Sequence, residues 1–371
     1  MESSSSGKSH SFVWNAVEQW TTQTFLITQG SGILAVILHQ LDWQFNGSQI
    51  ISTIVWVFTI VIFILFLLVY LIKAFMFPRL VRQQLDTDIV ELCCLASISI
   101  TLGVVTDMVA LVCAKDWGPS WAMVAYVLTW IDVALAIMSN VGIPYQYFAT
   151  EHPGIDGMPP NAVLPSIAAV TCAATCGTVA FAGDLSARAQ VPLILVGYIV
   201  LGIGLPYSFI ITAEYITYLL RNGLPPRGQS WMVWTLAGPL GQAAYACQIL
   251  GSAAASPGHQ VFANYDRGTF ITASSGQVIN AASALAGLVI WGYATFWALF
   301  SLIATIHLEF CTQGGIRNSK YSLSVWSPVF PMGVYALGTL QFGKDMNSPA
   351  WSALSSGDIQ AELNWEVAIY R

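Results

Sequence analysis

The chain has 371 residues, of which 56% are hydrophobic and only 9% are charged. Soluble domains carry about 25% charged residues, so this composition excludes a soluble globular enzyme as well as disordered and disulfide-rich classes. The net charge of −6 argues against a nucleic-acid partner, because a protein that binds nucleic acid shows a basic patch. The composition therefore predicts a polytopic all-α protein of the lipid bilayer.

Apolar stretches with few ionic side chains predict nine membrane-spanning helices, because about 20 apolar residues cross about 30 Å of hydrocarbon. In chain order the predicted spans are residues 24–41, 49–75, 91–114, 120–147, 159–182, 190–220, 229–254, 276–308 and 323–342. They lie in a transmembrane domain over residues 21–349, which follows a polar, Ser-rich segment, residues 1–20. That segment lacks the pattern of a secretory signal and is expected in the cytosol.

The positions of Lys and Arg set the expected orientation, because positive residues are more frequent in cytosolic loops. With a cytosolic N-terminus, and Arg371 left aside, eight of these residues lie inside and four outside. The inside set is Lys8, Lys73, Arg79, Arg82, Arg221, Arg227, Arg317 and Lys320, and the outside set is Lys115, Arg188, Arg267 and Lys344. The charge distribution therefore favours a cytosolic N-terminus.

The odd-numbered and even-numbered spans differ in composition. The even-numbered ones are bulky, as Trp56, Phe58 and Phe66 of the second span illustrate, whereas the odd-numbered ones are rich in Gly, Ala, Ser and Thr. Bulky side chains suit lipid-facing helices, and small ones suit helices that pack on other helices or line a path. The alternation predicts helical hairpins around a central pore, with odd helices inside and even helices outside. The alternative is that the small residues serve only tight packing.

The small or weakly polar residues of the odd-numbered spans are the pore-lining candidates. They are Gly30, Gly32, Ser99, Thr101, Thr175, Gly238, Pro239 and Gln242. Proline kinks a helix and frees a carbonyl, and prolines are expected to interrupt spans of both kinds. These prolines are Pro165, Pro239 and Pro331 in odd-numbered spans, and Pro144 and Pro206 in even-numbered ones. A ring of kinked helices would present backbone dipoles to an anion without a cluster of fixed cations.

Ionisable residues inside the predicted spans are functional candidates by default. They are His39, Asp107, Asp132, Glu214 and His307. Asp132 and Glu214 are the candidates for proton coupling. The alternative for Asp132, which lies deep in the fourth span, is a structural and neutral carboxyl group that hydrogen-bonds to a neighbouring helix.

Motifs of catalysis and metal binding are missing from the sequence. It contains no G-x-S-x-G, no H-E-x-x-H and no phosphate-binding loop. Its seven cysteines include no C-x-x-C pair, and Cys172 and Cys176 have no further ligand nearby in the sequence. We therefore expect no metal and no cofactor, and an intramembrane pathway enzyme is the rival hypothesis without a supporting motif.

Three segments resemble a known family. Residues 326–333 (WSPVFPMG) resemble the W-S-x-x-F-P-x-G motif of the tellurite-resistance/dicarboxylate transporter family, which includes plant slow anion channels, yeast malate permease and fungal sulfite efflux pumps. Residues 28–33 (TQGSGI) resemble the glycine-rich opening of that family. Residues 238–242 (GPLGQ) most resemble the sulfite pumps. The resemblance extends from Thr21 to Pro349.

The resemblance implies ten helices as five hairpins around a central pore, usually in a homotrimer with one pore in each subunit. It implies a pore-occluding phenylalanine, which here is Phe330, beside Pro331 and Gly333. The implied substrate is a small anion that is exported across a fungal plasma membrane. Sulfite or bisulfite comes first, malate or another C4-dicarboxylate second, and an acidic secondary metabolite third.

The chain departs from this family where a tenth helix is expected. Residues 350–371 carry Asp358, Glu362 and Glu366 at a spacing of four, which makes one helix face polar. The segment is too short and too charged to span a bilayer. We expect an atypical charged tail in place of the tenth helix, either from a truncated product or as a terminal surface helix.

Overall fold

The computed structural model describes residues 12–150, 154, 157–255, 261–265, 267–311 and 322–357. These residues are mostly helical, and the one β-type pairing among them is an isolated bridge between Arg267 and Ile271. The predicted all-α class is therefore confirmed.

The described chain folds into helices, labelled α, and short 3₁₀ or π segments, labelled η. The first part of the chain contains α1 (Phe12–Glu18), η1 (Thr22–Thr24), α2 (Phe25–Gln40), α3 (Ser48–Met76), α4 (Pro78–Thr87), α5 (Ile89–Cys94), α6 (Ala96–Met108), η2 (Val109–Cys113), α7 (Ala114–Trp117) and α8 (Pro119–Thr150). The second part contains η4 (Pro160–Val163), α9 (Leu164–Ala182), α10 (Ala187–Asn222), α11 (Ser230–Val233), η5 (Trp234–Ala237), α12 (Gly238–Ala255), α13 (Val261–Tyr265), α14 (Ala273–Thr305), η6 (Ile306–Cys311), η8 (Leu323–Trp326) and α15 (Val329–Met346).

A ring of helices α2, α6, α9, α12 and α15 forms the centre of the described structure. Each helix contacts the next one in this order, and α15 contacts α2, which closes the ring. In the most apolar 18-residue stretch within residues 160–182, which contain α9, all residues are buried, and in the corresponding stretches of residues 89–117 (α6) and 323–346 (α15) 72% and 78% are buried. These helices correspond to the odd-numbered spans, which the composition places inside.

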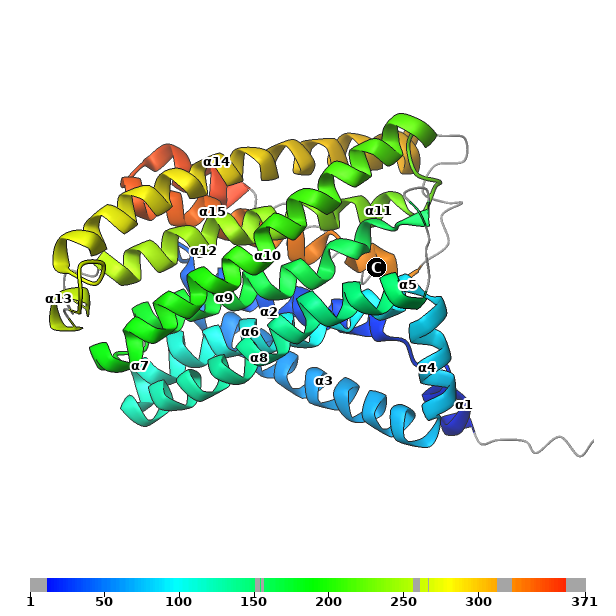
Figure 1. Ribbon diagram of the computed structural model, residues 1–371, viewed down its shortest axis with the longest axis horizontal. Coiled ribbons are helices and arrows are strands. Elements are labelled where there is room, and N and C mark those ends of the chain that lie inside the picture. The colour runs from blue at the N-terminus through cyan, green and yellow to red at the C-terminus, as the bar shows by residue number, and fades with distance from the viewer. Residues whose placement is uncertain are drawn as a thin grey trace, which may run out of the picture.

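Helices α3, α8, α10 and α14 lie outside the ring (Figure 1). In the most apolar 18-residue stretch of each of these helices, only 22% to 39% of the residues are buried. On α3, for example, Ile54, Phe58 and Leu65 are exposed. A soluble protein rarely exposes apolar surface on this scale, whereas hydrocarbon solvates it well. These helices correspond to the even-numbered spans, so the predicted two-layer arrangement matches the burial.

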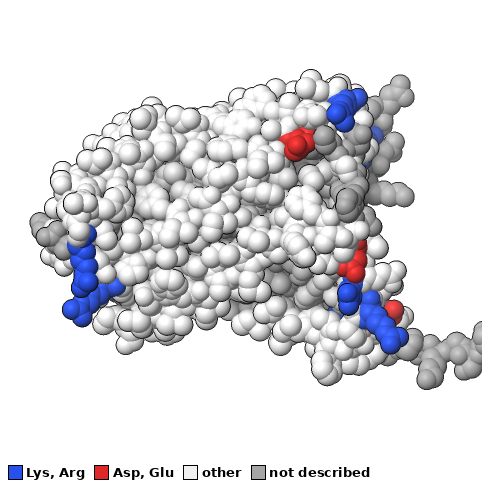
Figure 2. Space-filling model, viewed as in Figure 1, with Lys and Arg blue, Asp and Glu red and all other residues white. Residues whose placement is uncertain are grey.

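The described segments fit a membrane in length and charge. Seven of them are long and apolar enough to cross a bilayer, and the shorter α2 and the less apolar α12 occupy the positions of the first and seventh predicted spans. Figure 2 shows charged side chains at the two ends of the molecule and an uncharged band between them on the face in view. The structure is therefore that of a multi-pass membrane protein.

Close helix contacts within the ring, and between the ring and the outer helices, depend on glycine. A Cβ atom on Gly177 of α9 would lie 2.6 Å from Cγ2 of Ile249 on α12, and one on Gly204 of α10 would lie 2.7 Å from Cβ of Ala169 on α9. Both distances are too short for carbon atoms in contact, so a side chain at either position would push the helices apart. Small residues thus permit the inner helices to pack densely on one another and on the outer layer.

The prolines of the odd-numbered spans lie near helix starts rather than within continuous helices. Pro165, Pro239 and Pro331 are in the first turns of α9, α12 and α15, and a 3₁₀ segment precedes each of these helices. The first turn tolerates proline because its N–H groups have no partner within the helix. In the outer helices α8 and α10, by contrast, Pro144 and Pro206 lie inside the helix, as predicted.

Residues 349–357 form a helix at the start of the predicted tail. Trp351 packs against Trp291 of α14 and Phe342 of α15, with ring centroids 4.9 and 5.2 Å away. The Ser352 hydroxyl donates a hydrogen bond to Oδ2 of Asp42 at 3.0 Å. This part of the tail therefore packs at the end of the ring. Residues 358–371, and residues 1–11 of the N-terminal segment, lie outside the described residues.

The predicted orientation can be tested with a native thiol. Among the seven cysteines only Cys311 is exposed, and it follows α14 at the end of the bundle where the inner helices begin. A membrane-impermeant thiol reagent should label Cys311 only from the cytosolic side of sealed vesicles. A cysteine introduced at the exposed Ser120, at the opposite end of the bundle, should be labelled only from the extracellular side. The reverse pattern would invert the orientation.

Candidate functional site

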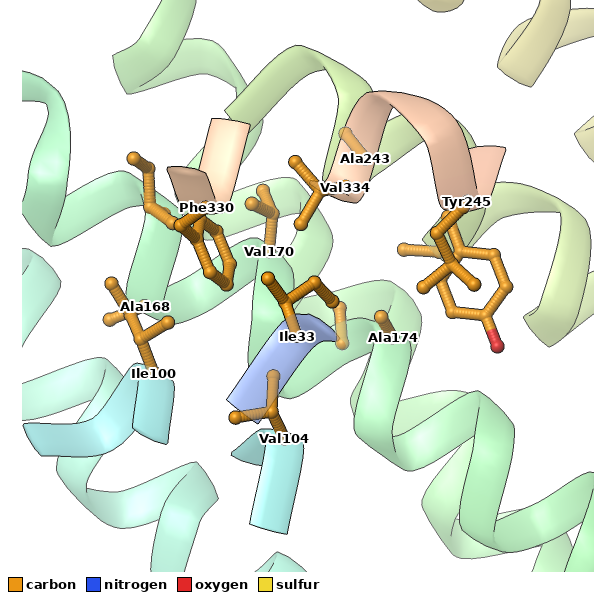
Figure 3. Close-up of a cluster of buried hydrophobic side chains, with 14 of the residues drawn as sticks. Ile33, Ile100, Val104, Ala168, Val170, Ala174, Ala243, Tyr245, Phe330 and Val334 are labelled. Atoms are coloured by element: carbon orange, nitrogen blue, oxygen red, sulfur yellow. The ribbon is translucent and has the colours of Figure 1, made fainter. Parts of the chain in front are cut away.

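Apolar side chains from the inner helices fill the centre of the ring (Figure 3). The central cluster consists of Ile33 from α2, Ile100 and Val104 from α6, Ala168, Val170 and Ala174 from α9, Ala243 and Tyr245 from α12, and Phe330 and Val334 from α15. Each of these residues is at most 1% exposed. Because a narrow apolar constriction excludes water and ions, a path through the ring is closed in this structure.

Phe330 lies at one end of this central cluster. It is the second residue of α15, its side chain is 0% exposed, and its ring points into the cluster (Figure 3). This position excludes the lipid-facing role and leaves the gate and the packed core as alternatives. The gating role stays a prediction.

The two neighbours of Phe330 in the predicted gate have different surroundings. Pro331 approaches Gly238, whose Cβ would lie 3.4 Å from Cγ of Pro331, and also borders a lateral apolar groove of ≈ 410 Å³ between α14 and α15. Gly333 is buried on α15. Pro331 therefore packs beside α12 and borders the groove, whereas the ring of Phe330 points into the central cluster.

Three glycines among the pore-lining candidates lie at helix contacts. A Cβ on Gly30 would lie 3.0 Å from Cγ1 of Val329, one on Gly32 would lie 2.5 Å from Cγ2 of Val104, and one on Gly238 would lie 3.1 Å from Cδ1 of Ile167. In the closed ring these glycines allow neighbouring helices to approach, which is the packing role left open by the sequence. Pro239 is likewise buried at the start of α12.

The polar pore-lining candidates differ in their partners. The hydroxyl groups of Thr101 and Thr28 share a hydrogen bond of 2.8 Å between α6 and α2. Gln242 of α12 is 1% exposed, and neither polar atom of its amide has a hydrogen-bond partner in the described part of the chain. A buried polar group without a partner is costly. Gln242 is therefore the candidate with the greatest capacity to bind an anion or water.

Asp132 lies at the contact between α6, α8 and α9. Its Oδ1 accepts a hydrogen bond of 2.6 Å from the Ser99 hydroxyl of α6. Its Oδ2 and the Thr175 hydroxyl oxygen of α9 both lie 3.1 Å from the position of a Cβ on Gly103. The structure thus brings Asp132, Ser99 and Thr175 together around Gly103. The hydrogen bond joins two helices, as the structural role of Asp132 requires.

Glu214, the other proton-coupling candidate, lies in different surroundings. It is on the outer helix α10 and is partly exposed, whereas Asp132 is fully buried. Its proton-coupling role remains a prediction.

A vestibule of ≈ 740 Å³ opens at the C-terminal ends of the inner helices. Its lining includes His39 and Gln40 of α2, Thr178 of α9, Tyr245 of α12 and Lys344 of α15. The Tyr245 hydroxyl accepts a hydrogen bond of 3.3 Å from Nε2 of Gln40 and lies 3.3 Å from the Thr178 hydroxyl. Tyr245 therefore belongs both to the vestibule and to the central cluster.

The N-terminal ends of the inner helices are packed by polar contacts instead. Thr22 lies just before α2 and forms two hydrogen bonds with Glu91. Its backbone N–H donates to Oε1 of the Glu91 side chain at 2.8 Å, and its hydroxyl donates to the Glu91 backbone carbonyl at 2.6 Å. Arg227 forms an ion pair with the buried Glu309 at 3.5 Å, and the Ser230 hydroxyl donates to the same carboxylate at 2.6 Å. The first contact ties the start of α2 to α5, which leads into the inner helix α6, and the second ties the segment that leads into α12 to the end of the outer helix α14.

The sequence pattern alone does not single out Tyr245 or Lys344 as site residues. A lone aromatic residue among the small side chains of residues 237–247 is the signal that could have identified Tyr245. Lys344 carries no such signal, because only the packing of α15 beside α2 places its ammonium 2.9 Å from the Gln40 carbonyl.

A closed ring of helices with an apolar centre and a polar vestibule at one end defines a membrane transport protein. Residues 19–358 match the SLAC1 family, described as voltage-dependent anion channel, and the chain belongs to this family. The resemblance of residues 326–333 to the tellurite-resistance/dicarboxylate transporters is thereby confirmed. The members of this family are transporters and channels, so the chain is a transport protein rather than an enzyme.

Several curated proteins are similar along most of the chain. The sulfite efflux pump SSU1 of Arthroderma benhamiae is 26% identical over 343 residues, which cover 92% of this chain and 87% of the pump. The pump of the same name from Trichophyton rubrum is 25% identical over the same shares. The malic acid transport protein of Schizosaccharomyces pombe is 21% identical over 90% of this chain and 73% of its own.

The Asp132→Asn variant tests the structural role of this residue. Asparagine keeps an Oδ1 acceptor for the Ser99 hydroxyl, so the variant should fold and transport almost normally. Asp132→Ala should lose about 1–3 kcal/mol of stability, because it leaves the buried hydroxyl without its partner. Thermal unfolding in detergent and anion flux in proteoliposomes measure both effects. An Asp132→Asn variant that is stable but inactive would instead assign Asp132 to the transport mechanism.

The Phe330→Ala variant tests the gate. Removal of the ring should hydrate the constriction and raise anion flux by about tenfold or more, which corresponds to a barrier lower by about 1.4 kcal/mol. Anion flux into proteoliposomes is measured for Phe330→Ala and for a control variant, Phe342→Ala. The control removes another fully buried aromatic ring of α15, one that is not among the residues of the central cluster. Truncation of a core Phe costs about 3–5 kcal/mol. A loss of stability in Phe330→Ala without a gain in flux would assign this ring to the core.

Proposed function

We propose that this chain exports sulfite or bisulfite across the plasma membrane. The observation that carries the proposal is the similarity to sulfite efflux pumps, which extends over 92% of the chain. The composition of the ring supports it, because α2, α6, α9 and α12 contain no Lys or Arg. Without fixed cations on these helices, an anion is attracted by backbone, amide and hydroxyl dipoles, which favours passage over tight binding.

The same feature disfavours a dicarboxylate. Proteins commonly hold a carboxylate with the paired N–H groups of Arg, and no inner helix supplies an Arg. The one cation that the inner helices contribute is Lys344, at the vestibule end of α15. Malate transport is the second candidate because of the similarity to the malic acid transport protein. An acidic secondary metabolite is the third.

The direction of the inner helices favours export. Their N-terminal ends carry partial positive charge and their C-terminal ends partial negative charge. With a cytosolic N-terminus, the positive ends face the cytosol and the vestibule faces outside. The lining of the vestibule also includes two acidic residues, Asp42 and Asp345, and one basic residue, Lys344. Its ionic side chains therefore add one net negative charge. An anion is thus attracted at the cytosolic end and released at the outer end.

The assembly that we propose is a homotrimer with a separate path through each subunit. The closed ring supports a separate path in each subunit, because the five inner helices of a single chain enclose the central cluster without a contribution from another copy. The lipid-facing surface of the outer helices is available for contacts between subunits.

Reconstituted transport decides the substrate. Proteoliposomes that contain the purified protein should release sulfite at a rate at least about ten times that of empty liposomes, which corresponds to a barrier lower by about 1.4 kcal/mol. They should release malate at a rate close to that of empty liposomes. Phe330→Ala serves as a variant with raised flux. Malate release without sulfite release would favour the dicarboxylate, and release of neither anion by either protein would overturn the proposal.

A further inference from the structure

We infer that Tyr245 closes the vestibule end of the transport path and donates a hydrogen bond from its hydroxyl to the anion there. This inference rests on the proposed function for its substrate. Its structural part, the closure of the path, is independent of which anion is carried.

The position of Tyr245 carries the first part of the inference. Tyr245 and Phe330 lie at opposite sides of the central cluster, with Ile33, Val334 and Ala174 between them (Figure 3). Tyr245 also lines the vestibule, although its side chain is only 1% exposed. The aromatic ring thus separates the ≈ 740 Å³ vestibule from the apolar centre of the ring. The path therefore has two aromatic closures rather than one.

The hydrogen bonds of Tyr245 support the second part of the inference, the hydrogen bond from its hydroxyl to the anion. Nε2 of Gln40 donates to the phenol oxygen, so the phenol hydrogen points elsewhere. Its other neighbour, the Thr178 hydroxyl, lies at 3.3 Å, whereas O–H···O bonds are usually 2.7–2.8 Å long. A weak bond of this kind is readily exchanged for a shorter, charge-assisted bond to an anion oxygen. The hydroxyl is thus a donor available at the floor of the vestibule.

The same two hydrogen bonds link Tyr245 to neighbouring helices. Gln40 is the last residue of α2 and Thr178 lies near the end of α9, so the hydroxyl of Tyr245 links three inner helices. An anion that takes the hydroxyl hydrogen competes with Thr178 and weakens the link to α9. Binding at the vestibule and movement of the ring are thereby coupled.

Cysteine accessibility tests the closure without reference to a substrate. Ala174→Cys places a thiol in the central cluster, and Ala182→Cys places one on the same helix in the vestibule. A charged methanethiosulfonate reagent is applied to the detergent-solubilised protein, and labelling of each site is measured by peptide mass spectrometry. With Tyr245 present, position 182 should react quickly and position 174 slowly. With Tyr245→Ala, position 174 should react at least tenfold faster, and position 182 at an unchanged rate.

A second variant keeps the test decisive if Tyr245→Ala fails to fold. Thr178→Val preserves the shape of the side chain but removes the hydroxyl partner of Tyr245, and should raise labelling at position 174 two- to threefold. Equal labelling at position 174 in the parent, Tyr245→Ala and Thr178→Val proteins would overturn the closure.

Transport kinetics test the hydroxyl. Tyr245→Phe keeps the ring, so position 174 should stay protected, while the sulfite concentration for half-maximal flux should rise several-fold with little change in maximal flux. Kinetics equal to those of the parent would overturn the hydrogen bond to the anion. If neither the parent nor Phe330→Ala carries sulfite, the proposed function fails, and the labelling result still decides the closure.

Discussion

The structure depends on one constraint: inside a bilayer each backbone N–H and C=O group must find its partner within the protein. Helices meet this requirement, and the ring of α2, α6, α9, α12 and α15 meets it around a centre that no lipid reaches. Because lipid gives no hydrophobic drive for helix association, the ring is held by close packing and hydrogen bonds. Gly32 and Gly177 permit that packing, and the Thr28–Thr101 and Ser99–Asp132 hydrogen bonds join neighbouring helices.

The same constraint shapes the site. A path for an ion through such a ring needs polar groups, yet each buried polar atom without a partner is costly. The structure closes the centre with apolar side chains such as Ile33 and Val334, and polar side chains line the vestibule. Gln242 is an exception within the ring, with two unpartnered amide atoms. The two ends also differ, since an ion pair and 3₁₀ turns pack one end, whereas the vestibule opens at the other.

Membership in an anion-channel family agrees with this design, because hydrophobic closure in place of fixed charge suits a pathway that must pass an anion without retaining it. Proline in the first turns of α9, α12 and α15 fits the same scheme. The break after each 3₁₀ turn leaves helix starts at the predicted cytosolic end, where their partial positive charge favours an anion.

The sequence by itself determined the class, the helical spans and the two layers. Ionic side chains are costly in hydrocarbon, so their scarcity marks each span. Bulky apolar side chains suit lipid, so composition distinguishes the outer helix α3 from the inner helix α9. The motif at residues 326–333 also indicated the family. Only the tertiary structure decided what each side chain faces. Gly30 contacts Val329, Ser99 meets Asp132, and Tyr245 lines the vestibule, because helices distant in the chain meet at these points. Periodicity within one helix carries no information on these partners.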